Sequence, residues 1–288
     1  MKTTLFNAKL VLISARSLTL LIACIVLVLS SPAHCESRVY TVGVVPQFDA
    51  HTLHAIWRPI LDRLEQETGE RFKLRGSTSI PDFEEEFETG RFDFAYMNPY
   101  HIVVANRLAG YQPLVRDHGH RLQGVLVVRK DSRIESPADL DGKAIAFPAA
   151  NALGASLQIR QELTDKFGIS FQPQYVKTHD SVYLNVLLNE TAAGGGVQNT
   201  LNRQPPEYRD GLRIIHRTTT VPPHPFCVSP DVPQTVRDKV AAAFLRMGTD
   251  NEGKRLLAQV PIERVGIASL EDYLVLKQMH LDRFFVKR

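Results

Sequence analysis

One stretch in the first half of the chain combines a buried strand with polar groups that could bind a ligand. Between residues 92 and 96, aromatic residues alternate with small or polar ones, which predicts a buried strand. Asn98 then offers a side-chain oxygen as a helix cap, and Pro99 suits the first helical position. A strand that leads directly into a helix presents free backbone N–H groups and the positive end of the helix dipole. Residues 92–101 therefore predict a site for a small anionic or polar ligand.

Other strand-to-helix turns are expected to face this stretch across a cleft. Ligands of open α/β sheets bind at the carboxyl ends of the strands, where such turns lie. Further turns of this kind follow predicted strands at 38–46, 144–148 and 174–177. In a two-lobed chain these turns form facing walls, and a hinge would let them close. The predicted ligand contacts are Pro46, Gln47, Tyr96, Asn98, Tyr100, Ala150, Asn151, His179, Asp180 and Ser181.

Several of these residues also have a purely structural interpretation, which the sequence leaves open. Asn98 could serve only as a helix cap, and Tyr96 and Tyr100 could belong to the hydrophobic core. His179 could be a polar residue at a helix start whose hydrogen bonds are already satisfied. The glycines at 194–196 are explained equally by close backbone packing and by room for a ligand.

The sequence contains no recognisable catalytic or metal-binding motif. His179, Asp180 and Ser181 are adjacent, so their side chains would diverge from a helix start instead of forming a triad. The histidine pairs at 51/54 and 118/120 lack a convincing third ligand. The glycines at 194–196 lack the Gly-Lys-Ser/Thr ending of a phosphate-binding loop. We therefore predict a protein that is not an enzyme and that needs no cofactor and no metal.

The elements that carry these turns alternate between strands and helices in two sets. The order is β-α-β-α-β-α-β-β in the first set and β-α-β-α-β in the second. A proline-rich extended segment at 218–226 follows, and then a mostly helical tail that includes 270–285. The predicted fold class is α/β with two lobes, each a mostly parallel sheet flanked by helices, and a hinge between them. The predicted division is 36–128 plus 226–288 for lobe 1 and 129–225 for lobe 2.

The first 35 residues have the composition of a secretory signal peptide. Three basic residues precede an apolar run at 18–29, and small residues at 31–33 suit a cleavage site. The apolar run is short for a membrane span, which needs about 20 residues. Cys35 suggests lipidation, but the bulky His34 beside the cleavage point fits that interpretation poorly. We predict an exported, periplasmic protein, with a lipid- or membrane-anchored form as the alternative.

Charge and cysteine content argue against two other classes of protein. The chain has 34 basic and 31 acidic residues, and the predicted signal peptide holds three of the basic residues and no acidic one. The processed chain is therefore neutral overall, and no basic patch indicates nucleic-acid binding. Only Cys227 certainly survives processing, which excludes a disulfide framework unless Cys35 is retained and pairs with it.

The motifs in this chain resemble those of one family of ligand-binding proteins. They lie at 43–46, 92–100, 124–132, 140–143, 179–181 and 192–195. Over residues 39–284 the chain resembles the phosphate/phosphite/phosphonate-type (PhnD-like) periplasmic substrate-binding proteins of ABC transporters, which have the type 2 periplasmic-binding fold. The resemblance implies ligand contacts at Tyr96 and Asn98, at the turn after the strand of the second lobe, and at His179.

The turn at 148–152 departs from the pattern of that family. Members that bind phosphonate or phosphite usually offer Ser and Thr hydroxyls there, where this chain has Pro-Ala-Ala-Asn-Ala. Backbone N–H groups remain, but a tetrahedral oxyanion prefers several charge-assisted donors. The resemblance therefore indicates the family, but it does not identify the class of ligand.

The sequence and the resemblance together predict an exported solute-binding protein that closes on a small, phosphate- or phosphonate-like anion for an ABC importer. Its expected partners are this ligand and an ABC permease, with no nucleic acid, and we expect a monomer. The same fold also suits a periplasmic sensor that signals to a membrane receptor kinase. It further resembles a pyrimidine-synthesising enzyme family, but that family needs a cofactor lysine and a cysteine-rich iron site, which one certain cysteine does not provide.

Overall fold

The computed structural model describes residues 38–286. The predicted signal peptide at 1–35, with the question of lipidation at Cys35, lies outside the described residues. Among residues 38–286, no helix is long and apolar enough to cross a membrane.

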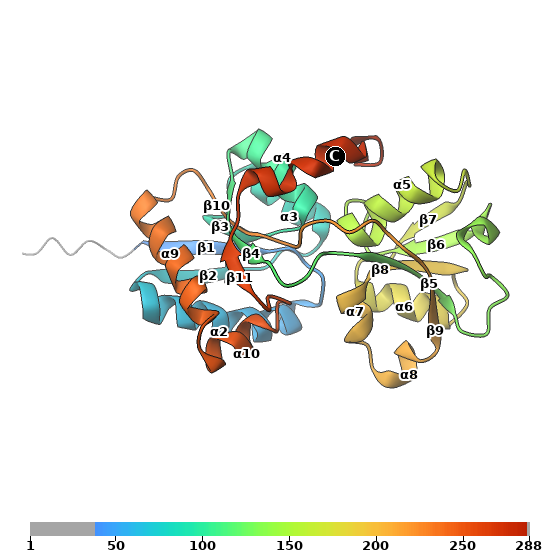
Figure 1. The fold of residues 1–288 in the computed structure, drawn as a ribbon, viewed down its shortest axis with the longest axis horizontal. Coiled ribbons are helices and arrows are strands. Elements are labelled where there is room, and N and C mark those ends of the chain that lie inside the picture. Colours follow the sequence, from blue (N-terminus) through green and yellow to red (C-terminus); the bar gives the residue numbers. More distant parts are fainter. Residues whose placement is uncertain (1–37, 287–288) are drawn as a thin grey trace, which may run out of the picture. The chain divides into compact units, whose positions relative to one another are not determined.

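The first lobe is built on a six-stranded sheet whose order is β11-β4-β10-β3-β1-β2. Strand β1 pairs in parallel with β2 and β3, whereas β10 and β11 pair antiparallel with their neighbours. The strands are β1 (Val39–Val44), β2 (Arg71–Arg75), β3 (Phe94–Tyr96), β4 (Gln112–Asp117), β10 (Phe226–Val228) and β11 (Val265–Ile267). The helices that belong with this sheet are α2 (Ala50–Thr68), α3 (Ile80–Glu88), α4 (Pro99–Ala109), α9 (Gln234–Met247) and α10 (Asn251–Leu257) (Figure 1).

The second lobe is built on a five-stranded sheet whose order is β7-β6-β8-β5-β9. Strand β6 pairs in parallel with β7 and β8, and β5 pairs antiparallel with β8 and β9. The strands are β5 (Gly124–Arg129), β6 (Ala144–Phe147), β7 (Gln172–Tyr175), β8 (Ala193–Val197) and β9 (Leu212–Arg217). The helical elements are a 3-10 turn (Pro137–Leu140), a π-helical turn (Leu153–Leu157) that continues into α5 (Gln158–Asp165), α6 (His179–Leu187), α7 (Gln198–Asn202) and α8 (Pro206–Arg209).

This architecture confirms the predicted two-lobed α/β class, with two corrections. Each sheet is mixed instead of mostly parallel, because strands that arrive from the other lobe, such as β10, run against their neighbours. The sequence analysis counted 124–128 with lobe 1, but β5 hydrogen-bonds only with strands of the second sheet. Alternating hydrophobicity reveals a strand but not the sheet that it joins.

Two extended segments connect the lobes and lie side by side (Figure 1). The first, residues 118–123, joins β4 to β5, and the second, residues 218–225, joins β9 to β10. Leu122 and Val221 exchange two backbone hydrogen bonds of 2.9 and 3.0 Å. These crossing segments have the position of the predicted hinge.

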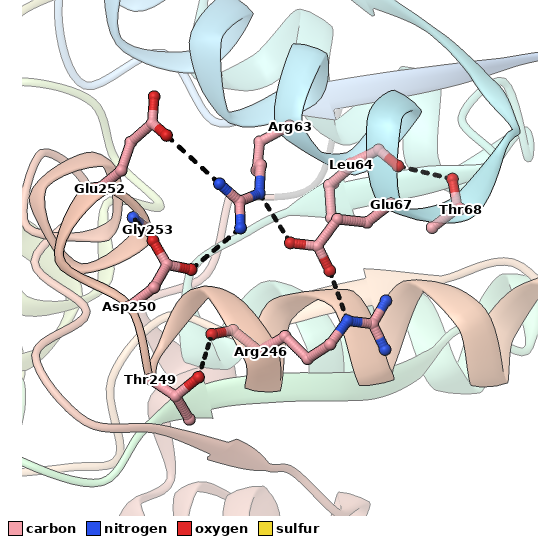
Figure 2. Close-up of polar contacts among 9 residues, drawn as sticks. All are labelled: Arg63, Leu64, Glu67, Thr68, Arg246, Thr249, Asp250, Glu252 and Gly253. Carbon is pink, nitrogen blue, oxygen red and sulfur yellow. Dashed lines mark hydrogen bonds and ion pairs between the residues drawn. The ribbon is translucent and has the colours of Figure 1, made fainter.

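The C-terminal tail contains 3-10 helices at Leu270–Met279 and Leu281–Arg283, within the segment that the sequence predicted to be mostly helical. Upstream of them, an ion-pair network ties α9 and α10 to α2 (Figure 2). Arg63 contacts Glu67 at 2.7 Å, Asp250 at 3.0 Å and Glu252 at 3.3 Å, while Glu67 also pairs with Arg246 at 2.6 Å. Such a network holds the tail more firmly than isolated surface pairs would.

Glycines allow the π-helical turn Leu153–Leu157 to lie directly on the second sheet. A Cβ atom at Gly195 would come within 2.1 Å of the carbonyl oxygen of Ala155, and one at Gly124 within 2.0 Å of that of Gly154. Heavy atoms cannot approach so closely, so only glycine fits at these positions. Close backbone packing, one of the two interpretations of the glycines at 194–196, therefore accounts for Gly195.

Candidate functional site

A small pocket lies where the two lobes meet. Its volume is about 20 Å³, which is room for about one water molecule. We call it the interlobe pocket; it is lined by Val45, Gln47, Ile80, Asn98, Ala152, Leu153, Gly154, Ala155, His179, Val197 and His224. None of these side chains is acidic, lysine or arginine, so the pocket is lined by neutral polar and apolar groups.

Asn98 reaches the interlobe pocket from the first lobe, at the junction of β3 and α4. Its side-chain oxygen accepts hydrogen bonds from the backbone N–H groups of Tyr100 (2.9 Å) and His101 (2.8 Å). Its Nδ2 atom donates to the backbone oxygen of Asn151 in the second lobe at 3.2 Å. The predicted helix cap is confirmed, and the same side chain also contacts the opposite lobe.

A buried polar network extends this contact between the lobes. Asn151 Nδ2 donates to Glu84 Oε2 at 2.9 Å, and the other oxygen of Glu84 lies 2.9 Å from His101 Nε2. Asn151 also exchanges two hydrogen bonds of 2.9 Å with the backbone of Val286 in the C-terminal tail. Asn151 therefore joins α3 and the C-terminal tail to the second lobe, and Glu84 is a contact that the sequence analysis did not predict.

His179 enters the interlobe pocket from the start of α6 in the second lobe. The side chain is only 2% exposed, and its Nδ1 atom lies 3.1 Å from Thr200 Oγ1. Burial lowers the pKa of His179 to about 4, so the ring is neutral at pH 7. Its Nε2 atom has no hydrogen-bond partner within residues 38–286, which leaves that atom available to a ligand. The helix is capped by Thr178, whose Oγ1 atom accepts a hydrogen bond from the Ser181 N–H at 3.1 Å.

His224 is a pocket residue that the sequence analysis missed. It lies in the second crossing segment, stacks on Tyr96 with ring centroids 5.4 Å apart, and approaches Gln47 Nε2 at 3.5 Å. Burial lowers its pKa to about 3, with smaller contributions from His101 and His179. The sequence could have indicated His224 only through its place in the predicted extended segment at 218–226, because a segment that crosses between two lobes passes the cleft between them.

The second wall of the interlobe pocket is the start of the helix that begins at Leu153. Residues 152–155 line the pocket, and the first N–H groups of a helix have no acceptor within the helix itself. The π-helical turn and α5 form one continuous helix of two segments, 153–157 and 158–165, so its dipole favours negative charge at this end. This helix start therefore presents backbone N–H groups to the pocket, whereas 148–152 has no hydroxyl side chain.

Six of the ten predicted contacts line neither the interlobe pocket nor the larger cavity beside it. The backbone oxygen of Ala150 accepts a hydrogen bond from Arg160, and Tyr100 packs its ring on Phe285. Asp180 is exposed and accepts from Gln204, and Ser181 bonds to the capping Thr178. Pro46 is buried beside Gln47, and Asn151 does not line the interlobe pocket but accepts a hydrogen bond from Asn98, which does. Ligand contact by all ten residues stays a prediction; the six outside the cavities are Pro46, Tyr100, Ala150, Asn151, Asp180 and Ser181.

A larger cavity of about 250 Å³ adjoins the interlobe pocket on the side of the crossing segments. We call it the hinge-side cavity; it is lined by Tyr96, Asp117, His120, Arg121, Leu122, Gln123, Val197, Gln198, Asn199, Asn202, Pro223, His224, Pro261 and Ile262. Tyr96 lines this cavity and not the interlobe pocket, and its hydroxyl donates to the backbone oxygen of Val260 at 3.1 Å. Burial raises the pKa of Tyr96, so its hydroxyl remains protonated at neutral pH.

We expect the ligand-free protein to lose stability as the pH falls from about 6.5 towards 4. The pKa of His179 is about 4 in the folded protein, against about 6.5 in an unfolded chain. The unfolded chain therefore takes up the proton first, and stability that is present above pH 6.5 is lost on acidification. By pH 5 the loss from this group is about 2 kcal/mol. Urea titrations at pH 7 and pH 5 measure it.

His179→Asn is the matched control for this pH dependence, because it keeps a polar group towards Thr200 but cannot be protonated. The free-energy difference between wild type and His179→Asn should shrink by about 2 kcal/mol from pH 7 to pH 5. A difference that stays constant between the two pH values would show that His179 is not held neutral by burial.

A comparison of this chain with models of known protein families identifies its family. The family model for the ABC transporter phosphonate periplasmic substrate-binding proteins matches residues 42–273. Among residues 38–286, no group of three or more His, Cys, Asp or Glu side chains could hold a metal ion.

Solved structures of low sequence identity have the same fold. A binding protein component of an ABC phosphonate transporter from Pseudomonas aeruginosa aligns with a TM-score of 0.76 and 18% identity, over 86% of this chain and 87% of that one. PhnD1 from Prochlorococcus marinus, in complex with methylphosphonate, aligns with a TM-score of 0.78 and 14% identity, over 86% and 98%. The family model describes periplasmic substrate-binding proteins, and the first of these structures is of a binding protein component. Since the family model covers most of the described residues, this chain belongs to the phosphonate-type periplasmic substrate-binding protein family of ABC transporters.

Proposed function

We propose that this protein is the periplasmic solute-binding component of an ABC importer and that its lobes close on a small phosphate- or phosphonate-like anion. The observation that carries the proposal is the convergence of donors from both lobes on one pocket. Asn98 comes from the first lobe, and His179 and the helix start at Leu153 come from the second. Helix starts and neutral N–H donors bind anions in many proteins.

The pocket as it stands is too small for such an anion, so binding requires the lobes to separate and close again around it. The contact between Asn98 and the Asn151 backbone, at 3.2 Å, holds the lobes together directly. A ligand would replace this contact by bridging the same groups. Its binding free energy then favours the closed state, which is the state that a permease would recognise.

The neutral lining also limits the charge of the ligand. With His179 and His224 uncharged at pH 7, the donors are imidazole, amide and backbone N–H groups. Such donors satisfy a monoanion better than a dianion, because no cation offsets the loss of hydration. Glu84 lies two hydrogen bonds from the pocket-lining Asn98, through Asn151, and adds repulsion against a second negative charge.

Calorimetric titration with methylphosphonate, phosphite and phosphate tests this proposal. At least one of these anions should bind, and His179→Asn should weaken its binding about tenfold or more, equivalent to about 1.4 kcal/mol. His179→Gln places an amide near the former Nε2 position and should restore part of the affinity. The exposed His54 on α2 supplies the control His54→Asn, which should bind like wild type.

Two results would contradict the proposal. The first is that none of the three anions binds or raises the melting temperature. The second is that His179→Asn binds an anion with the affinity of wild type. His179 serves better than Asn98 here, because Asn98 also caps α4 and its removal costs about 1 kcal/mol of stability.

A further inference from the structure

The hinge-side cavity has a size and a position that binding of a bare anion does not explain. Its volume of about 250 Å³ is far larger than the 20 Å³ of the interlobe pocket. The two cavities share the side chains of Val197 and His224, which form the boundary between them. Within residues 38–286 the only polar contact of His224 is the 3.5 Å approach to Gln47, so this side chain is weakly held.

The polar side chains of the hinge-side cavity are mostly amides with unused hydrogen-bonding capacity. Asn199 makes no side-chain hydrogen bond with any residue between 38 and 286. Gln123 uses its Nε2 atom on Thr218 at 3.1 Å, which leaves its oxygen as an acceptor. Asn202 accepts from Gln198 at 2.7 Å, which leaves its Nδ2 atom as a donor. Apolar side chains complete the lining, namely Leu122, Val197, Pro223 and Ile262.

The charged side chains of this cavity are already engaged. The Asp117 carboxylate is 1% exposed and accepts hydrogen bonds from the backbone N–H groups of Gly119, His120, Glu263 and Arg264, between 2.6 and 3.1 Å. His120 lies 3.1 Å from Glu263, and Arg121 is exposed and donates to Thr220. No free carboxylate is left for a cationic group, and the one arginine lies in solvent, where a charge contact is worth little.

We propose that the hinge-side cavity receives the organic substituent of a phosphonate or phosphate monoester whose anionic group binds in the interlobe pocket, and that this substituent is neutral and carries hydroxyl or amide groups. The inference rests on the proposed function and adds to it the class of ligand. Free amide groups and apolar walls match such a substituent, because each hydroxyl finds a partner while its carbon atoms are removed from water.

Calorimetry with four phosphonates that differ only in the substituent tests the proposal. Methylphosphonate would occupy the interlobe pocket alone. The other three compounds add a substituent that would enter the hinge-side cavity: it is neutral in 3-hydroxypropylphosphonate, cationic in 2-aminoethylphosphonate and anionic in 2-carboxyethylphosphonate. The hydroxypropyl compound should bind about tenfold tighter than methylphosphonate, a gain of about 1.4 kcal/mol. The two charged compounds should not show this gain.

Asn199→Leu keeps the size of the side chain but removes its hydrogen bonds, and Asn202→Leu does the same at an exposed position that tolerates substitution. Both variants should lose most of the gain for the hydroxypropyl compound while binding methylphosphonate like wild type. Asn251→Leu, at an exposed position on α10, is the control and should keep the gain.

The outcomes separate this inference from the proposed function. If methylphosphonate binds but no substituent adds affinity, or if the gain persists in both variants, the inference is wrong and the proposed function stands. If the charged compounds gain most, the neutral chemistry assigned to the cavity is wrong. If none of the four compounds binds, the inference is wrong; the proposed function is wrong with it only if phosphate and phosphite also fail to bind.

Discussion

Gly195→Ala is expected to lower the free energy of unfolding by roughly 3 kcal/mol or more. The new methyl group would lie 2.1 Å from the carbonyl oxygen of Ala155 and 2.6 Å from the ring of Phe147. Neither neighbour can move cheaply, because the first is backbone in the π-helical turn and the second is a fully buried ring. The helix start would have to leave the sheet, which also moves the N–H groups that line the interlobe pocket.

Urea unfolding of wild type and Gly195→Ala measures this loss, and Gly76→Ala is the matched control. No heavy atom lies within 4 Å of a Cβ atom placed at Gly76, and its φ angle is not in the left-handed region. The control should be as stable as wild type or slightly more stable, since alanine restricts the unfolded chain. Equal stability of all three proteins would contradict the close packing of the helix on β8.

Glu162→Gln is expected to cost about 3 kcal/mol at pH 7. Burial alone would raise the pKa of the Glu162 carboxyl, but hydrogen bonds from His216, the Thr219 N–H and Lys166 outweigh it and lower the pKa to about 2. The corresponding distances are 2.6, 3.0 and 3.0 Å, and the side chain is 1% exposed. The carboxylate thus ties α5 to β9 and to the second crossing segment.

The sign of the pH dependence identifies the mechanism. The folded pKa of about 2 lies below the ordinary value of 4.5, so the stabilisation is present above about pH 4.5 and is lost as the pH falls through the folded value. The stability difference between wild type and Glu162→Gln should fall to less than half between pH 7 and pH 3. Glu207→Gln, at an exposed position on α8, should change stability little at either pH. A difference independent of pH would mean that the carboxylate charge does not matter.

The C-terminal tail connects the two lobes. The tail follows elements packed on the first lobe, yet its last described residues bond to the second: Arg160 donates to the Phe284 backbone oxygen at 2.7 Å, and Val286 pairs with Asn151. Separation of the lobes would break these bonds together with the Asn98 contact. The tail and Asn98 therefore both bond across the two lobes.

Local features of the sequence determined the elements that carry the site. Helix α4 begins at Pro99 after its Asn98 cap and ends at Gly110, which adopts the left-handed conformation, as the residue types predicted. The turn signals likewise predicted the turn that precedes the helix at Leu153 and the start of α6 at His179, because caps and turns depend on neighbours in the sequence.

Only the tertiary structure decided which of these segments meet and which other residues lie between them. His224 and Glu84 reach the site through contacts across more than sixty residues of sequence, and no local pattern records such pairs. Strands β10 and β11 have three residues each, too few to give a periodic signal, and the partner sheet of β5 was equally hidden. Caps, turns and hydrophobic periods follow from residues that are neighbours in the sequence. Sheet membership, the interlobe pocket and the neutral state of His179 and His224 depend instead on how the whole chain packs and excludes water.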